Sequence, residues 1–112
     1  MAKVISFYVH HIFSRQSGRI TVDGRCCDDA IKRGDIFRVV FRHLFPKDMQ
    51  GFAEKRAPMA QRHVSLRVVS MTAYDRPFEE LDPGLTARIE LEGVGGELLM
   101  EDDILGSEYA PG

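Results

Sequence analysis

The strictest constraint in this chain is a run of eight residues, 85–92, in which apolar and polar side chains alternate without a miss. The apolar members are Leu85, Ala87, Ile89 and Leu91, and the polar members are Thr86, Arg88, Glu90 and Glu92. Side chains of a strand point to opposite faces with period two, whereas a helix would scatter these residues around its circumference. The pattern therefore predicts a strand with one face in an apolar core.

Four other segments have the same period and predict further strands. They are 4–13 with Ile5, Phe7, Val9 and Phe13 on one face, 19–25 with Ile20 and Val22, 36–43 with Phe37, Val39 and Phe41 opposite Arg38 and Arg42, and 63–74 with Val64, Leu66 and Val68. The first two flank a turn-like segment, 14–18, and are expected to form a hairpin. After the glycine-rich break at 93–96, residues 97–105 are expected to add a last short strand around Leu98 to Met100, then Ile104-Leu105.

Short strands separated by turns, without a strong amphipathic helix, predict an all-β fold in one domain, 1–112. Closing about six antiparallel strands into a small barrel would remove the exposed edges that separate strands present. The aperiodic stretch 44–62 is expected to be one long insertion loop, with room for a short helix at 47–56. The tail at 107–112 is expected to fray.

The cysteines and the first residues indicate the compartment. Cys26 and Cys27 are adjacent, a spacing that rarely allows an unstrained disulfide, so no disulfide framework is expected. No stretch approaches the ~20 apolar residues needed to span a bilayer. His10, His11 and Arg15 interrupt the N-terminal segment before a signal core develops. A cytoplasmic location without a membrane partner is the expectation.

Charge is unevenly distributed along the chain. Residues 1–67 hold 13 of the 15 Lys and Arg and 6 of the 17 Asp and Glu, a balance of +7, whereas residues 68–112 hold 2 and 11, a balance of −9. If the two halves fold onto separate faces, the surface is dipolar and steers a charged partner. The favoured interpretation is that basic and acidic strands pair and neutralise each other, because opposite charges across a strand pair are stabilising.

Short motifs follow one another along the chain. They are Ile12-Phe13-Ser14, then Gly18-Arg19-Ile20-Thr21-Val22-Asp23-Gly24-Arg25, then Ala30-Ile31-Lys32-Arg33-Gly34-Asp35, later Pro77, Glu79-Glu80 and Pro83-Gly84, and finally Leu91-Glu92-Gly93 and Glu101-Asp102-Asp103-Ile104-Leu105. In order and spacing they resemble the second domain of translational GTPases such as elongation factor Tu. The resemblance covers nearly the whole chain apart from 44–62, and it implies the same barrel fold.

The resemblance also implies functional expectations. In that family the second domain helps to hold the acceptor end of aminoacyl-tRNA and contacts the ribosome. Arg19 and Asp29 stand where the family has glycines, and the matching positions are turn and core residues, so no binding residue is carried over. Gly24 and Gly34 are expected at turns with positive φ, and Asp35 is expected to bond its own turn. No Gly-x-x-x-x-Gly-Lys-Ser/Thr loop occurs, so GTP binding is not expected.

The histidines, cysteines and acidic runs form no recognisable catalytic or metal motif. The histidines are His10, His11, His43 and His63. Neighbouring strand residues point to opposite faces, so His10 and His11 do not chelate one ion together. Cys26 lacks the surroundings of a catalytic nucleophile, and runs 79–82 and 101–103 lack the spacing of a calcium loop. No metal, cofactor or enzymatic activity is predicted.

Basic residues between 38 and 67 are the candidate partner-binding residues. They are Arg38, Arg42, Lys55, Arg56, Arg62 and Arg67. The leading hypothesis is a non-catalytic, stand-alone module that binds a protein partner as an accessory, regulatory or inhibitory protein. The alternative is an RNA- or ribosome-associated domain that uses the basic face around Arg38, Arg42 and Arg62. A net charge of −2 disfavours strong nucleic-acid binding, DNA is not expected, and the oligomeric state is left open.

Overall fold

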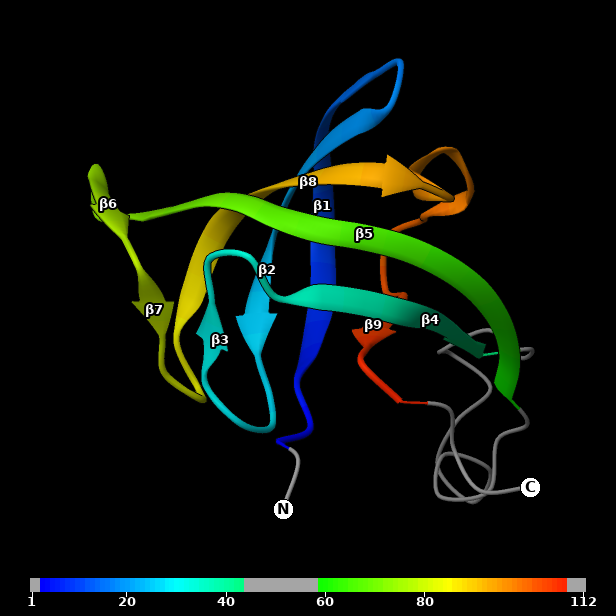
Figure 1. The fold of residues 1–112 in the computed structure, drawn as a ribbon, viewed down its shortest axis with the longest axis horizontal. Coiled ribbons are helices and arrows are strands. Elements are labelled where there is room, and N and C mark those ends of the chain that lie inside the picture. Colours follow the sequence, from blue (N-terminus) through cyan, green and yellow to red (C-terminus); the bar gives the residue numbers. More distant parts are fainter. Residues whose placement is uncertain (1–2, 44–58, 109–112) are drawn as a thin grey trace.

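The computed structural model describes residues 3–43 and 59–108 (Figure 1). Its elements are β1 (Ser6–Gln16), β2 (Arg19–Cys26), β3 (Ile31–Lys32), β4 (Ile36–His43), β5 (Met59–Ala73), β6 (Arg76–Phe78), β7 (Glu80–Leu81), β8 (Thr86–Val94), the 3-10 turn η2 (Gly96–Leu98) and β9 (Ile104–Gly106). Within these ranges no helix is long and apolar enough to cross a membrane.

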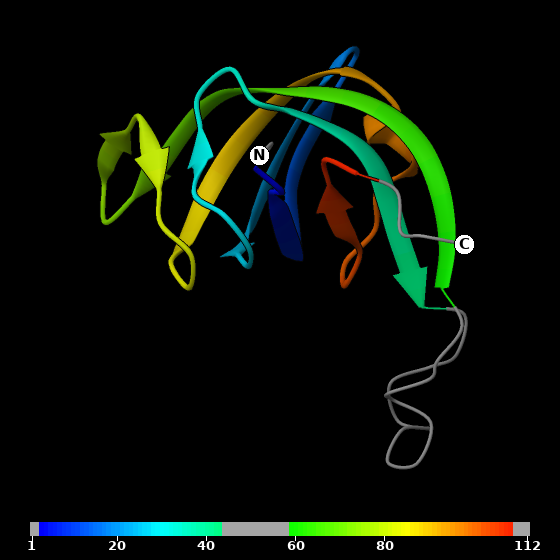
Figure 2. The same cartoon turned by 60° about the horizontal axis from the view of Figure 1, so that its bottom comes forward.

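Six strands form a closed ring (Figures 1 and 2). β4 pairs with β9, β9 with β1, β1 with β2, β2 with β8, β8 with β5, and β5 returns to β4, every pair antiparallel. The predicted all-β, closed, six-stranded antiparallel barrel is therefore confirmed. Outside the ring, β6 extends β5 as a hairpin, and β3 pairs with β7 in a separate two-stranded sheet.

Apolar side chains from all six ring strands meet inside the barrel. The interior includes Phe7 and Val9 of β1, Ile20 and Val22 of β2, Phe37 and Val40 of β4, Val64, Leu66, Val68 and Met71 of β5, Ala87, Ile89 and Leu91 of β8, and Leu105 of β9. The alternation of residues 85–92 holds throughout, with Leu85 packed against the edge of this core. The predicted hairpin of β1 and β2 is also present.

The pairing of β4 with β5 shifts between Phe37 and Val39. As a result Phe37 and Val40, three residues apart, both enter the core. Val39 and Phe41 lie instead beside Gly106, where a methyl group on the glycine would stand 3.4 Å from Val39 and 2.8 Å from Phe41. Within β4, the alternation of inward and outward side chains therefore shifts by one residue.

This shift overturns the two faces predicted for residues 36–43. Arg38 and Arg42 do not share one face, and Phe37 does not share the face of Val39 and Phe41. Arg38 is exposed. Arg42 lies on the same side of the strand as Val40, two positions before it, which belongs to the core. The period of two fails here because it assumes an unbroken ladder of hydrogen bonds. A bulge moves every later side chain to the opposite face of the sheet.

Register shifts in β1 have a similar effect on Phe13. β1 is irregular against β2 between Val9 and His11 and again between Ile12 and Ser14. Phe13, expected on the core face, is 54% exposed. The guanidinium carbon of Arg88 lies 3.6 Å from the centre of its ring.

Several predicted boundaries also differ from the structure. β5 begins at Met59, so 59–62 are strand rather than loop. Of the last strand expected within 97–105, the part at 104–105 is present as β9 (Ile104–Gly106), whereas residues 98–100 are not a strand. The acidic run 79–82 contains β7, whose Leu81 is fully buried. Ser107 and Ile5 exchange two hydrogen bonds, of 3.0 and 3.1 Å. The possible helix at 47–56 and residues 109–112 lie outside the described part.

Two glycines are required for different reasons. Gly34 has φ 96°, and the Asp35 carboxylate accepts a hydrogen bond of 2.8 Å from the Lys32 N–H across this turn, as predicted. Gly24 does not have the positive φ expected of it and lies within β2. A Cβ atom there would stand 2.0 Å from the Tyr8 carbonyl oxygen, so glycine permits close approach of β1.

Candidate functional site

The loop between β8 and β9, residues 95–103, fills a gap in the barrel wall, and we call it the capping loop. β9 is only three residues long, and it pairs with Ser6–Tyr8 of β1 and Val39–Phe41 of β4. Beyond it, Val9 continues the pairing by donating to the Asp103 carbonyl at 2.9 Å and accepting from the Asp102 N–H at 2.7 Å. The capping loop therefore replaces strand pairing where β9 is too short to provide it.

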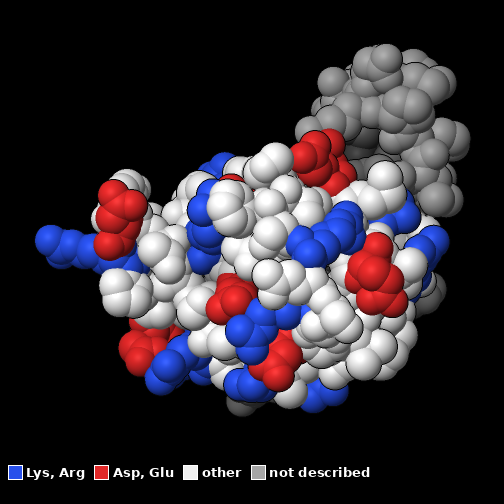
Figure 3. Space-filling model, turned by 90° about the horizontal axis from the view of Figure 1, so that it is seen from above, with Lys and Arg blue, Asp and Glu red and all other residues white. Residues whose placement is uncertain are grey.

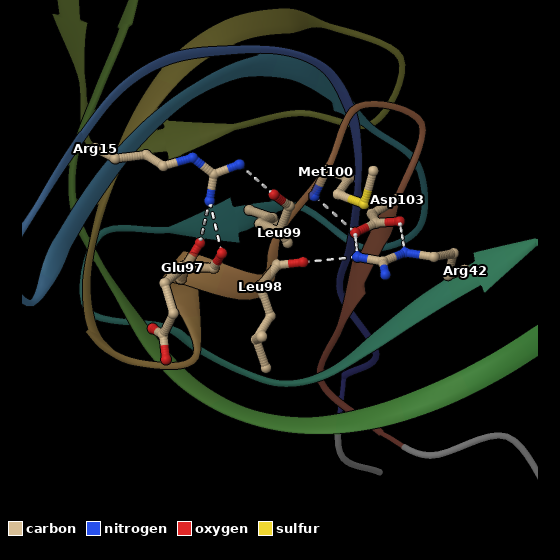
Figure 4. A network of polar contacts seen from close by, with 8 residues as sticks. Arg15, Arg42, Glu97, Leu98, Leu99, Met100 and Asp103 are labelled. Atoms are coloured by element: carbon tan, nitrogen blue, oxygen red, sulfur yellow. Dashed lines mark hydrogen bonds and ion pairs between the residues drawn. The ribbon is translucent and has the colours of Figure 1, made fainter.

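Arg15, near the end of β1, holds the capping loop from one side (Figure 4). Its guanidinium donates hydrogen bonds of 3.0 Å to the Gly96 and Glu97 carbonyls and a third bond to the Leu99 carbonyl. The last carbonyls of a helical turn lack partners within the turn, and a cation interacts well with them. The Gly96 carbonyl additionally accepts the Leu99 N–H at 3.2 Å.

Arg42, at the end of β4, holds the same loop from the other side (Figure 4). Its guanidinium donates to the Leu98 carbonyl at 2.6 Å and binds both oxygens of Asp103 at 2.9 Å. Asp103 is 1% exposed, and its carboxylate also accepts the Met100 N–H at 2.8 Å. The hydrogen bond to Asp103 raises the pKa of Arg42 above its usual value. A buried carboxylate needs such partners, because losing its hydration is costly.

The two arginines together satisfy four consecutive carbonyls, those of residues 96–99, and so fix the path of the loop. Leu99 is fully buried and anchors the loop in the core. Its neighbours Leu98 and Met100 are 41% and 55% exposed. The result is a rigid backbone that presents two apolar side chains to solvent.

Two contacts tie the far end of the capping loop to the outer face of β1. The Tyr8 hydroxyl donates to the Asp102 carboxylate at 2.7 Å, and His11 Nδ1 lies 3.0 Å from a Glu101 oxygen. Asp102 has φ 72°, a left-handed conformation that aspartate adopts more readily than most residues.

The four candidate basic residues that the structure describes have different surroundings. Arg42 is committed to Asp103 and the capping loop, and Arg67 forms an ion pair with Glu92 at 3.3 Å. Arg38 and Arg62 are exposed and form no ion pair with any residue that the structure describes. The other two, Lys55 and Arg56, lie outside the described residues.

Ion pairs join the basic first half of the chain to its acidic second half. They are Arg19 with Glu90 and Glu92, Arg33 with Glu79, Arg42 with Asp103 and Arg67 with Glu92. Figure 3 shows cationic and anionic groups interleaved across the visible face. This arrangement agrees with mutual neutralisation across strand pairs, the favoured interpretation of the charge distribution.

Residues 3–43 and 59–108 contain no cluster of His, Cys, Asp and Glu suited to hold a metal ion. Cys26 is buried in the core, and burial raises the pKa of its thiol to about 11. A thiol that keeps its proton at neutral pH is a poor nucleophile. Cys27 is exposed, and both cysteines are free thiols.

The closed six-stranded barrel has the fold of a translation-factor barrel domain. The crystal structure of translation elongation factor SelB from Methanococcus maripaludis in its apo form matches 96% of this chain, with a TM-score of 0.67 and 18% identity. The complex of that factor with the GTP analogue GppNHp gives a TM-score of 0.66 and 17% identity over 96% of this chain. The chain covers 20% of the length of each. No protein-family model and no curated protein sequence matches it.

The likeness to SelB is one of fold, and it agrees with the fold expected from the resemblance to the second domain of translational GTPases. At this level of identity the residues of the site have to be judged by their own contacts. The roles of Arg15 and of the capping loop were not predicted from the sequence. The signal was present in the glycines at 93–96, which end a strand, but the expected strand at 98–100 concealed the loop that follows them.

Proposed function

We propose that this chain is a non-catalytic module that binds a protein partner through the capping loop, in an accessory, regulatory or inhibitory role. One observation carries the proposal: Leu98 and Met100 stand exposed on a backbone fixed by two arginines. A contact loop that is already ordered loses little conformational entropy when it binds. Methionine adapts its shape to a partner, and apolar side chains supply the area that drives association.

The charge distribution supports a protein partner over RNA. Binding to a phosphate backbone requires several cations that are free to replace counterions. Of the candidate residues that the structure describes, Arg42 and Arg67 are already paired with carboxylates, which leaves Arg38 and Arg62. Two exposed arginines that lie outside the capping loop are a weak basis for an RNA- or ribosome-binding surface.

The two cysteines support a cytoplasmic location for this module. Both Cys26 and Cys27 are free thiols, and exposed free thiols persist in reducing compartments. The proposed partner is accordingly a cytoplasmic protein.

The proposal is tested by placing a photo-crosslinking amino acid at Leu98, at Met100 or at the control position Thr72 in the cells that produce the protein. Thr72 is exposed on β5, away from the capping loop. We expect one discrete protein adduct from both loop positions, resistant to ribonuclease and absent from the Thr72 variant.

Two results would reject the proposed function. Adducts that ribonuclease removes would favour the RNA alternative, which further predicts salt-dependent RNA binding that is lost when Arg38 and Arg62 are both replaced by glutamine. Equal adduct yields from Leu98, Met100 and Thr72 would show that the capping loop has no special role.

A further inference from the structure

An open basin of about 510 Å³ lies on the outer face of the barrel and borders the capping loop. Its wall includes Tyr8 and His10 of β1, Arg25 of β2, Cys27, and Asp102 of the capping loop. Tyr8 and Arg25 are direct cross-strand neighbours, and the rings of Tyr8 and His10 are 5.1 Å apart. The hairpin of β1 and β2 therefore gathers a guanidinium, an imidazole and a phenol in one hollow.

Arg25 differs from the other arginines that line concave surfaces. Arg15 donates to three carbonyls, Arg19 pairs with two glutamates and Arg33 pairs with Glu79. Arg25 is exposed and forms no ion pair and no side-chain hydrogen bond with any residue in the described ranges. Arg25 thus lines the basin, and its five N–H donors have no acceptor among the described residues.

The acidic groups around the basin limit what it accepts. Asp102 lines the same wall, but its carboxylate accepts the Tyr8 hydroxyl and forms no ion pair with Arg25 within 4.0 Å. Asp28 and Asp82 lie close enough to raise the pKa of the Cys26 thiol, after burial and the neighbouring Cys27. One compact anion can pair with Arg25, whereas a polyanion would meet these three carboxylates.

We propose that Arg25 and the basin around it bind the carboxylate of one acidic side chain of the protein partner. A guanidinium and a carboxylate match in planar, bidentate geometry, and His10 and Tyr8 supply polar surface beside that pair. The basin is continuous with the capping loop through Asp102, so one partner contacts both. The inference rests on the proposed function for the source of the carboxylate.

The test is a titration of the isotope-labelled protein, followed by NMR at low salt, with a glycine-glutamate-glycine peptide that is N-acetylated and C-terminally amidated, so that it carries one carboxylate. The peptide is expected to shift the amide signals of Tyr8, Arg25 and Gly84 and to bind at least tenfold more weakly to the Arg25→Gln variant. The same blocked peptide with glutamine in place of glutamate carries no carboxylate and is expected to produce no such shifts. The matched control is Arg76→Gln, because Arg76 is also exposed and without an ion pair in the described part but lies on β6, outside the basin.

Three outcomes would overturn the carboxylate site. They are equal binding of the glutamate and glutamine peptides, equal weakening by Arg25→Gln and Arg76→Gln, and tighter binding of an oligouridine to the same residues. The titration needs no natural partner, so its failure is distinct from failure of the crosslinking test. Localised binding of the glutamate peptide without protein adducts at Leu98 and Met100 would reject the protein-binding function and leave only a site for free carboxylates, contrary to the proposed source.

Discussion

Arg42 shows how much a single residue's role depends on the phase of its strand. Its sequence position suggests a solvated cation beside Arg38. The register shift in β4 turns it inward, where it neutralises Asp103 and supports the capping loop. The same charge therefore contributes to folding rather than to an RNA surface.

Replacing Arg42 by methionine should destabilise the protein by about 3 kcal/mol. This is the lower end of the range for breaking a buried ion pair, because the Arg42 side chain is 27% exposed while that of Asp103 is 2% exposed. The measurement is chemical denaturation, with Arg38→Met as the matched control, expected to change the free energy of unfolding by less than about 0.5 kcal/mol. Equal effects of the two substitutions would contradict the inward assignment of Arg42.

The buried thiol of Cys26 makes stability depend on pH in alkaline solution. Its pKa rises from 9.0 to about 11 on folding, so the folded state holds the proton more tightly than the unfolded state does. The associated stabilisation is complete below pH 9 and is lost as the pH rises toward 11. The free energy of unfolding should fall more steeply over that interval for the natural protein than for Cys26→Ala. Parallel curves would show that Cys26 does not titrate differently on folding.

At the scale of elements, the bounds of several strands were predictable from alternation, and their faces were predictable where the ladder is regular. Residues 36–43 and 19–25 have nearly their predicted bounds, and the face of β8 is correct at each position. Bulges in β1, β4 and β5 were not predictable, because they arise from pairing with partners distant in the chain. For the same reason, no local pattern showed that Arg15 and Arg42 would meet residues 96–99.

Arg15 should control the mobility of the capping loop. In Arg15→Gln the carbonyls of Gly96, Glu97 and Leu99 lose their cationic donor. The free energy of unfolding is expected to fall by about 1 kcal/mol, because Arg15 is exposed and water can donate to the carbonyls in its place. Amide hydrogen exchange of Leu98 and Leu99 should accelerate while exchange in β8 is unchanged. Gln16→Ala serves as the control, and unaltered exchange in the loop would refute the role given to Arg15.

At the scale of the whole molecule, three residues complete the ring. β9 is the strand that bonds to both β1 and β4, and Leu105 is its contribution to the core. Without this strand the barrel becomes an open sheet with two unpaired edges, which are templates for aggregation.

Leu105→Ala should therefore lower the free energy of unfolding by about 3 kcal/mol. It should also expose β1 and β4, the two neighbours of β9, together. Hydrogen exchange is expected to accelerate in Ser6–Tyr8 and in Val39–Phe41 by the same factor, because both segments bond to β9. Ile104→Ala, on the outer side of the same strand, should cost about 1 kcal/mol. Faster exchange in only one of the two segments would show that the ring does not open as a unit.

The position of β9 in the chain also limits how early the barrel can close during synthesis. Residues 104–106 must reach residues 6–8 and 39–41 before the ring exists, so the ring cannot close on the ribosome until residues 104–106 have left the exit tunnel. Until then the apolar side chains of its strands remain available to chaperones or to neighbouring nascent chains. Native pairing over such long separations is slow to nucleate, so docking of β9 should be a late step in the folding of the barrel.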